Sequence, residues 1–232
     1  ILANNLGSVK TTRLITRNKR RHVYVNVRSN YTGYDGIIHR KLSEEEDEQT
    51  YLEEYHLDNA PGSNIISFEL ENTDDVTQPF TVVASVENEQ YATQAGDMIY
   101  INPFFKDRMS ESPFTNSKRV FPVEFNYGSS KSFTTTINLP SGYEIVDIPA
   151  NESHRFSENA GFSFIQQVST NYIQMRLTIV NNETTVEPER YNDLREYYAT
   201  LSDFFNQQVV LRKVDDAASD ESQNRSDSSS GK

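Results

Sequence analysis

The chain of 232 residues contains no cysteine and no tryptophan. Without cysteine it has no thiol nucleophile, no thiolate metal ligand and no disulfide, so Cys-His-Asp catalysis is excluded within it. The lack of disulfides fits a periplasmic protein as well as a cytosolic one. No apolar run approaches the length that spans a bilayer, and residues 1–6 lack the charged start and long apolar core of a secretory signal.

Signatures of enzymes are missing as well. The sequence has no Gly-x-Ser-x-Gly turn, phosphate-binding loop or dinucleotide fingerprint. Its four histidines stand in no metal-binding spacing, and the acidic run at 44–48 lacks the interleaved glycine of a calcium loop. We therefore expect no catalytic, cofactor-binding or metal-binding residues, and no cofactor. The histidines are His22, His39, His56 and His154.

Charge is spread unevenly along an acidic chain with a net charge of −12. Residues 1–41 are strongly basic and include the run at 17–21, whereas residues 44–54 are acidic. The basic run fits either a nucleic-acid patch or a solvated strand edge facing the acidic segment. Because overall acidity repels phosphate, we favour the strand edge and expect no nucleic-acid partner.

Aromatic residues make up 11% of the chain, with 13 Tyr and 13 Phe, and they fall in patterned segments. Residues 22–28 alternate cleanly, which is typical of a half-buried strand. Further extended segments are predicted at 64–70, 80–86, 97–101, 120–127 and 209–211, and residues 161–168 and 172–180 form a predicted hairpin. Pro140 and Gly142 bracket a predicted turn between two strands.

Two helices are expected, at about 43–56 and 188–208. Ser43 and Glu46 form a capping-box pattern for the first, after a turn at 32–36 and an extended pair, Ile37 and Ile38. Pro188 opens the second, whose apolar stripe repeats at helical spacing. These elements predict a mainly β (α+β) fold: antiparallel, sandwich-like sheets in two packed halves, each with one helix.

The expected organisation is a first β-rich half at 1–110, a second at 111–214, and a disordered, acidic, serine-rich tail at 215–232. Residues 102–118 are the best internal boundary, although their phenylalanines indicate that the segment packs down. Four aromatic residues of the predicted loops suit stacking on a sugar or an extended peptide, but core or loop-anchoring roles are the simpler interpretation. They are Tyr31, Tyr34, Tyr100 and Phe104.

The order of several short motifs resembles a known family. The motifs include Gly33-Tyr-Asp-Gly36, Arg119-Val-Phe-Pro-Val-Glu-Phe125, Leu139-Pro-Ser-Gly-Tyr143 and Val209-Val-Leu-Arg-Lys213. Over about residues 9–214 this order is similar to the C-terminal β-rich domain, of unknown function, of bacterial transglutaminase-like proteins of the cell envelope. In that family a papain-like transglutaminase core precedes the C-terminal domain.

The resemblance implies a context for the chain. It implies a periplasmic or envelope location, and partners that are either the transglutaminase-like core of the same parent chain or other envelope proteins. The family's catalytic residues belong to the core, and no position here matches them. Because the chain opens on Ile1, we expect it to begin within a longer protein. The leading hypothesis is a non-catalytic structural or interaction module; the alternative is a glycan- or peptide-binding module.

Overall fold

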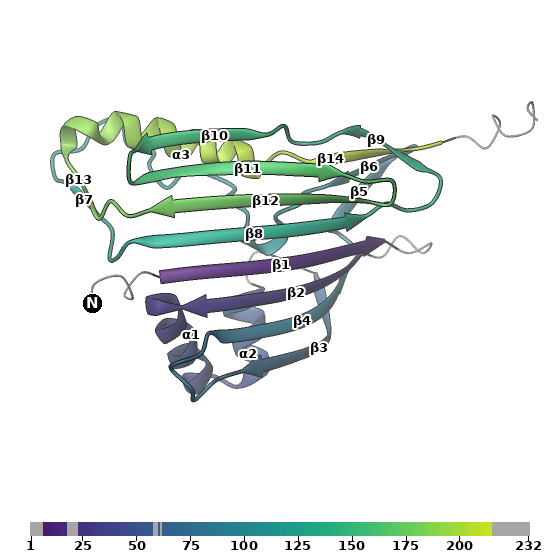
Figure 1. Cartoon of the computed structure of the whole chain (residues 1–232), viewed down its shortest axis with the longest axis horizontal. Coiled ribbons are helices and arrows are strands. Elements are labelled where there is room, and N and C mark those ends of the chain that lie inside the picture. Colours follow the sequence, from purple (N-terminus) through teal and green to yellow (C-terminus); the bar gives the residue numbers. More distant parts are fainter. Residues whose placement is uncertain (1–6, 18–22, 58–59, 61, 215–232) are drawn as a thin grey trace, which may run out of the picture.

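The computed structural model describes residues 7–17, 23–57, 60 and 62–214. Its largest element is an eight-stranded sheet with the order β10-β11-β12-β8-β1-β2-β4-β3 (Figure 1). These strands are β1 (Gly7–Arg17), β2 (Val23–Thr32), β3 (Ser63–Glu71), β4 (Phe80–Asn88), β8 (Ser129–Asn138), β10 (Glu152–Ser157), β11 (Ala160–Val168) and β12 (Tyr172–Asn181).

Smaller elements pack on one face of this sheet. A four-stranded sheet has the order β5-β6-β14-β9, and β7 pairs with β13. Their bounds are β5 (Ala92–Ala95), β6 (Met98–Ile101), β7 (Val123–Glu124), β9 (Tyr143–Asp147), β13 (Thr185–Val186) and β14 (Val209–Lys213). The helices are α1 (Gly33–Glu45), α2 (Glu48–Tyr51), which continues into a π-helical turn (Leu52–His56), and α3 (Tyr191–Phe205), which follows a 3-10 turn (Pro188–Arg190).

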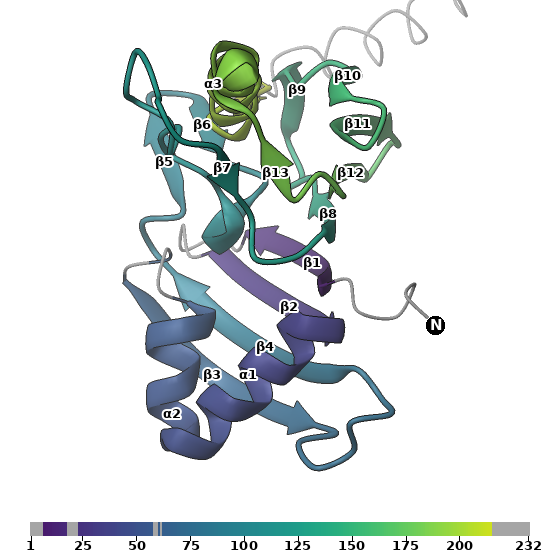
Figure 2. The same cartoon turned by 90° about the vertical axis from the view of Figure 1, so that its left-hand side faces the viewer.

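The two faces of the large sheet differ in what covers them. Viewed along the strands, α1, α2, β5 and β6 all lie on the same side (Figure 2). The side chains of Val23, Val25 and Val27 point to that side and are buried, whereas Asn26 between them and Arg28 after them are exposed. Alternation along the strand therefore places one face in the core and the other in solvent. No helix within the described residues is long and apolar enough to cross a membrane.

The structure confirms the mainly β fold with packed antiparallel sheets. Strands β11 and β12 form the predicted hairpin, with Phe164 opposite Leu177. The second predicted helix is present as the Pro188–Arg190 turn and α3. The turn before β9 is also present: Gly142 has φ 77°, and the Tyr143 amide donates to the carbonyl of Pro140 over 3.3 Å. The strands on either side of this turn, β8 and β9, belong to different sheets.

One parallel pairing joins the two predicted halves. Strand β1 runs parallel to β8, with Arg13 opposite Thr135 and Ile15 opposite Ile137. The large sheet thus continues across residue 110, and a single buried cluster contains side chains from both sides of that position. That the ranges 1–110 and 111–214 are separate units stays a prediction.

The predicted start of the first helix and its capping box are wrong. Helix α1 begins at Gly33, so Ile37 and Ile38 are helical and exposed instead of extended. Ser43 lies inside α1, where its hydroxyl donates to the carbonyl of Arg40. The N-terminal cap belongs to α2 instead, because the Asp47 carboxylate accepts the amides of Gln49 and Thr50. The β-branched pair favoured a strand, but the packing of its neighbours decides the local structure.

Two predicted segments cannot be compared. Residues 18–21 of the basic run, His22, and the tail at 215–232 lie outside the described residues. The first part of segment 102–118 packs down as expected, since Phe104 and Phe105 are buried, whereas residues 115–118 are exposed.

Candidate functional site

The four aromatic residues suggested as ligand contacts do not meet in one cleft. Tyr31 and Phe104 are buried, whereas Tyr34 is exposed and stacks on Tyr127 with 4.8 Å between ring centroids. Tyr100 is half-buried and lines a pocket that none of the other three reaches. The structure thus separates the predicted contacts into core, surface and pocket positions.

Phe104 anchors the core and offers no surface to a partner. Its ring centroid lies 4.9 Å from that of Phe205 and 5.7 Å from that of Phe204, both on α3. Edge and tilted contacts of this kind are the usual packing of buried phenylalanines. The simpler interpretation, a core role, therefore holds for this residue.

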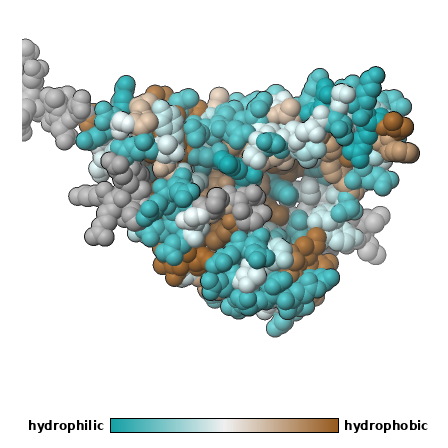
Figure 3. Space-filling model, turned by 180° about the vertical axis from the view of Figure 1, so that it is seen from behind, coloured by the Kyte–Doolittle hydropathy of each residue, from teal (hydrophilic) through white to brown (hydrophobic). Residues whose placement is uncertain are grey.

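A second cavity lies between α1, strands β1, β2 and β8, and a 3-10 turn, Phe105–Asp107. Its volume is about 260 Å³. The predicted contact residue Tyr31 lines it together with Tyr55, and its ionisable lining otherwise consists of Asp35, His39, Lys106, Asp107, Arg108 and Lys131. We call it the basic cavity, because three cationic side chains face two carboxylates. Seen from behind, the molecule is hollowed between the part that carries α1 and α2 and the part above it (Figure 3).

A buried ion cluster forms the inner wall beside this cavity. Arg13 on β1 is 0% exposed, and its guanidinium donates to Oδ2 of Asp107 and, over 3.1 Å, to the hydroxyl of Thr135. It also lies 5.4 Å from the ring centroid of Phe133. Nζ of Lys106, which is buried, donates to Oδ1 of Asp107 over 2.7 Å. One carboxylate is therefore shared by two buried cations, and burial lowers the pKa of Arg13 to about 10.

The turn that carries Lys106 and Asp107 is conformationally strained. Phe105 has φ 51°, in the left-handed region that costs a residue with a side chain about 1–2 kcal/mol. Its ring is buried in an edge contact with Tyr91, at 4.7 Å between centroids. This packing holds the strained backbone and keeps Lys106 and Asp107 at the cavity.

Two histidines lie beside the cluster and are hydrogen bonded to tyrosines. Nδ1 of His39 lies 2.8 Å from the Tyr51 hydroxyl, and Nδ1 of His56 lies 3.1 Å from the Tyr31 hydroxyl. Burial, followed by the positive charge of Lys106, lowers the pKa of His39 to about 4 and that of His56 well below its ordinary value. Both rings are therefore neutral near pH 7 and serve as hydrogen-bonding groups. Within the described ranges, no group of three His, Asp or Glu side chains could hold a metal ion.

The sequence carried a faint signal for this cluster. Val9, Thr11, Arg13 and Ile15 alternate along β1, and all four are buried. Because two of the four are polar, the alternation does not stand out as a strand, and β1 was not predicted. An arginine at an inward-facing position of an alternating segment is the feature that could have predicted a buried charge on β1.

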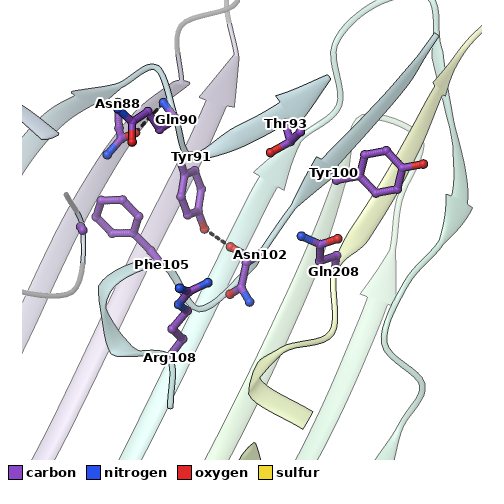
Figure 4. A pocket seen from close by; sticks show the side chains of 10 residues that line it. Asn88, Gln90, Tyr91, Thr93, Tyr100, Asn102, Phe105, Arg108 and Gln208 are labelled. Atoms are coloured by element: carbon purple, nitrogen blue, oxygen red, sulfur yellow. Dashed lines mark hydrogen bonds between the residues drawn. The ribbon is translucent and has the colours of Figure 1, made fainter. Parts of the chain in front are cut away.

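Tyr100 belongs to a separate pocket of about 210 Å³, which we call the Tyr100 pocket. Figure 4 shows Asn102 in its middle, with Tyr91 and Phe105 on one side and Tyr100 and Gln208 on the other. The Tyr91 hydroxyl donates to the carbonyl of Asn102. Further amide side chains, from Asn88 and Gln90, line its far end. The exposed cation Arg108 also lines it, so an aromatic ring among amides and one positive charge suits a polar ligand.

The segment before β7 carries the most exposed apolar pair among the described residues. Val120 and Phe121 are 81% and 76% exposed. The following residues are anchored: Val123 is buried, and the Phe125 amide donates to the carbonyl of Thr184 over 2.8 Å. Of the predicted extended segment 120–127, only Val123 and Glu124 form a strand, and the bend before this strand presents two large apolar side chains to solvent.

Residues 97–211, about half of the chain, match the model of a family described as a domain of unknown function with a solved structure (DUF3858). The crystal structure of a "putative protease" from Parabacteroides distasonis shares 18% identity and a TM-score of 0.38 over 42% of this chain. The match covers 19% of that protein, and a TM-score this low does not establish a shared fold. No curated protein matches the chain.

Proposed function

We propose that the chain is a non-catalytic interaction module of a transglutaminase-like protein of the cell envelope. The order of motifs in the sequence supports the context, and the exposed pair Val120 and Phe121 supports the role. The pair belongs to the motif Arg119-Val-Phe-Pro-Val-Glu-Phe125, one of those that carry the family resemblance. The partner we propose is the transglutaminase-like core domain of the same parent chain.

Residues of this motif divide into two sets. Val123 and Phe125 pack inward, in a small cluster that also contains Tyr191 and Leu194. Internal packing explains why Val123 and Phe125 are apolar. It does not explain Val120 and Phe121, whose side chains are largely exposed. Large apolar side chains that are exposed next to an anchored strand are typical of contacts with another surface.

Binding to a separately produced core domain tests the proposal. Replacing Phe121 with serine is expected to weaken binding at least about tenfold, because a buried phenylalanine side chain contributes about 2 kcal/mol. Val76, which is 75% exposed in a loop, provides the matched control, and Val76→Ser should leave the affinity unchanged. Equal affinities for wild type and Phe121→Ser would contradict docking through this segment. Hydrolase or crosslinking activity of the chain alone would contradict the non-catalytic role.

A second candidate function rests on the Tyr100 pocket. We propose as the alternative that this pocket binds a glycan or an extended peptide, with Tyr100 as the stacking surface and Gln90 and Gln208 as hydrogen-bonding groups. A glycan array and a peptide library probed with wild type and Tyr100→Ala would test it. Binding that disappears in the variant supports this alternative, whereas no binding by the wild type to either set excludes it.

A further inference from the structure

The basic cavity concentrates positive charge in a protein whose net charge is −12. Lys106, Arg108 and Lys131 line it, and Arg13 lies behind its wall. Asp107 is already occupied, because Arg13 binds one of its oxygens and Lys106 the other. Asp35 is the second lining carboxylate, and its Oδ1 accepts the hydroxyl of Tyr127. The cationic groups therefore exceed the carboxylates available to neutralise them.

This arrangement is costly for folding. Burying Arg13 and Lys106 removes their hydration, and one shared carboxylate compensates for it only in part. Nε of Arg13 is buried without any hydrogen-bond partner. The left-handed backbone of Phe105 adds strain next to Lys106. Several destabilising features at one place in a fold are typical of functional sites.

Two cationic side chains at the mouth of the cavity form no ion pair with the described residues. Lys131 and Arg108 are both exposed, and neither has an ion-pair partner among the residues that the structure describes. Lys131 lies on the core-facing side of β8, two residues before the buried Phe133. Burial, followed by the positive charge of Lys106 and then of Lys131, lowers the pKa of His39, which lines the same cavity.

We propose that the basic cavity binds a small oxyanion, a carboxylate or phosphate group, held by Lys106, Arg108 and Lys131. Lys106 and the Arg13–Asp107 pair form a rigid inner wall, and Arg108 and Lys131 close on the anion from the mouth. At about 260 Å³ the cavity is smaller than the roughly 300–1,000 Å³ typical of pockets for drug-sized ligands, so a small anionic group fits it best.

Calorimetric titration of the whole chain with sodium phosphate and with sodium acetate, at constant low ionic strength set with chloride, tests the proposal. The wild type is expected to bind at least one of the two saturably, and the tighter one distinguishes a phosphate site from a carboxylate site. Lys131→Gln should weaken binding about tenfold, the effect of losing one charge-assisted hydrogen bond. Lys10→Gln is the matched control, because Lys10 is exposed on the neighbouring strand β1 on the opposite face of the sheet.

A second readout locates the bound anion. The imidazole signals of His39 in proton NMR should shift on saturation with the anion, whereas those of His154, at the far edge of the sheet, should not. Lys131 is exposed, so its replacement should leave the unfolding midpoint unchanged, and lost binding cannot be attributed to misfolding. Absence of saturable binding by both anions, or equal affinity in wild type and Lys131→Gln, would overturn the proposal.

Discussion

Two helical layers cover the same face of the same sheet, and they do so with opposite chemistry. Under α3 the contact is aromatic: Phe204 lies 4.8 Å from Phe164 and 5.5 Å from Phe162 between ring centroids. Under α1 and α2 the contact contains Arg13 and His56, both fully buried and polar. The α3 side is held by apolar packing, whereas the α1–α2 side combines apolar packing, such as Tyr51 on Phe80 at 5.9 Å between ring centroids, with buried hydrogen bonds and ion pairs.

The polar layer also ties a loop to the helix. The Arg40 guanidinium on α1 donates to the carbonyls of Asn72, Asp75 and Gln78, and it lies 5.9 Å from the ring centroid of Phe80. A single side chain thereby fixes the turn between β3 and β4. The apolar contacts of the α3 side therefore stabilise the fold, whereas the buried charges of the α1–α2 side lower its stability and form a charged cavity.

The largest effect is expected on the aromatic side. Phe204→Ala should lower the free energy of unfolding by about 4 kcal/mol, because it removes a fully buried ring and leaves a cavity. Glu196→Ala, on the exposed face of α3, should change it by less than about 0.5 kcal/mol. Denaturant unfolding measures both. A small loss for Phe204→Ala would mean that α3 is not held by its aromatic contacts.

A somewhat smaller effect is expected on the polar side. Arg13→Met should lower the free energy of unfolding by about 3 kcal/mol, because Asp107 keeps Lys106 but loses its second cationic partner in a buried setting. Denaturant unfolding at low and at high salt measures the loss, which should be nearly the same at both, since buried pairs are little screened. A loss that disappears at high salt would show that the pair is exposed to solvent.

Acid should weaken the polar side specifically. Burial lowers the pKa of His39 in the folded chain to about 4, against about 6.5 when unfolded, so the unfolded state takes up a proton first as the pH falls. The contribution of neutral His39 to the free energy of unfolding is complete above pH 6.5 and is lost between pH 6.5 and pH 4. We expect a loss of about 2 kcal/mol, less than the full shift implies, because the ring is not completely buried.

One variant separates this pH dependence from that of other groups. His56 and the charges that face the two rings, from Lys106, Lys131 and Arg13, remain in a His39→Gln variant. That variant should show a shallower fall in stability over the same range than the wild type. An unchanged slope in His39→Gln would contradict a neutral, buried His39.

The smallest effect concerns how the helices begin. Asp47→Ala should lower the midpoint of thermal unfolding, because the carboxylate caps two amides of α2. Asp193→Ala, in the first turn of α3, should lower it less, since α3 has no side-chain cap and follows a proline turn. Thermal unfolding of the two variants compares them. Equal losses would mean that the cap does not stabilise α2.

The aromatic side was predictable from the sequence, and the polar side was not. Tyr191, Leu194 and Leu201 recur at helical spacing, which is enough to place α3 on a sheet. The same holds for Val23, Val25 and Val27 on β2. The spacing of apolar residues is enough to predict a helix or strand where the buried residues are apolar and close together in the chain.

The basic cavity draws its residues from positions far apart in the sequence. Arg13, His39, Lys106 and Lys131 meet because β1 pairs in parallel with β8 and because the Phe105 backbone adopts a left-handed turn. Neither the pairing nor the turn leaves a local pattern, and charged residues are ordinarily read as exposed. The cavity therefore emerges only in three dimensions.

One variant tests most directly whether the polar side gives up stability for binding. Arg13→Met, Lys106→Met and Asp107→Leu together replace the ion cluster with apolar side chains of similar size. The free energy of unfolding of this triple variant is measured with and without phosphate or acetate. Without anion we predict that it equals or exceeds that of the wild type, because buried ion clusters are often replaced by apolar side chains without loss of stability. Added anion should not raise it, because the variant lacks the binding site. A triple variant that is less stable than the wild type and still gains stability from the anion would contradict the account.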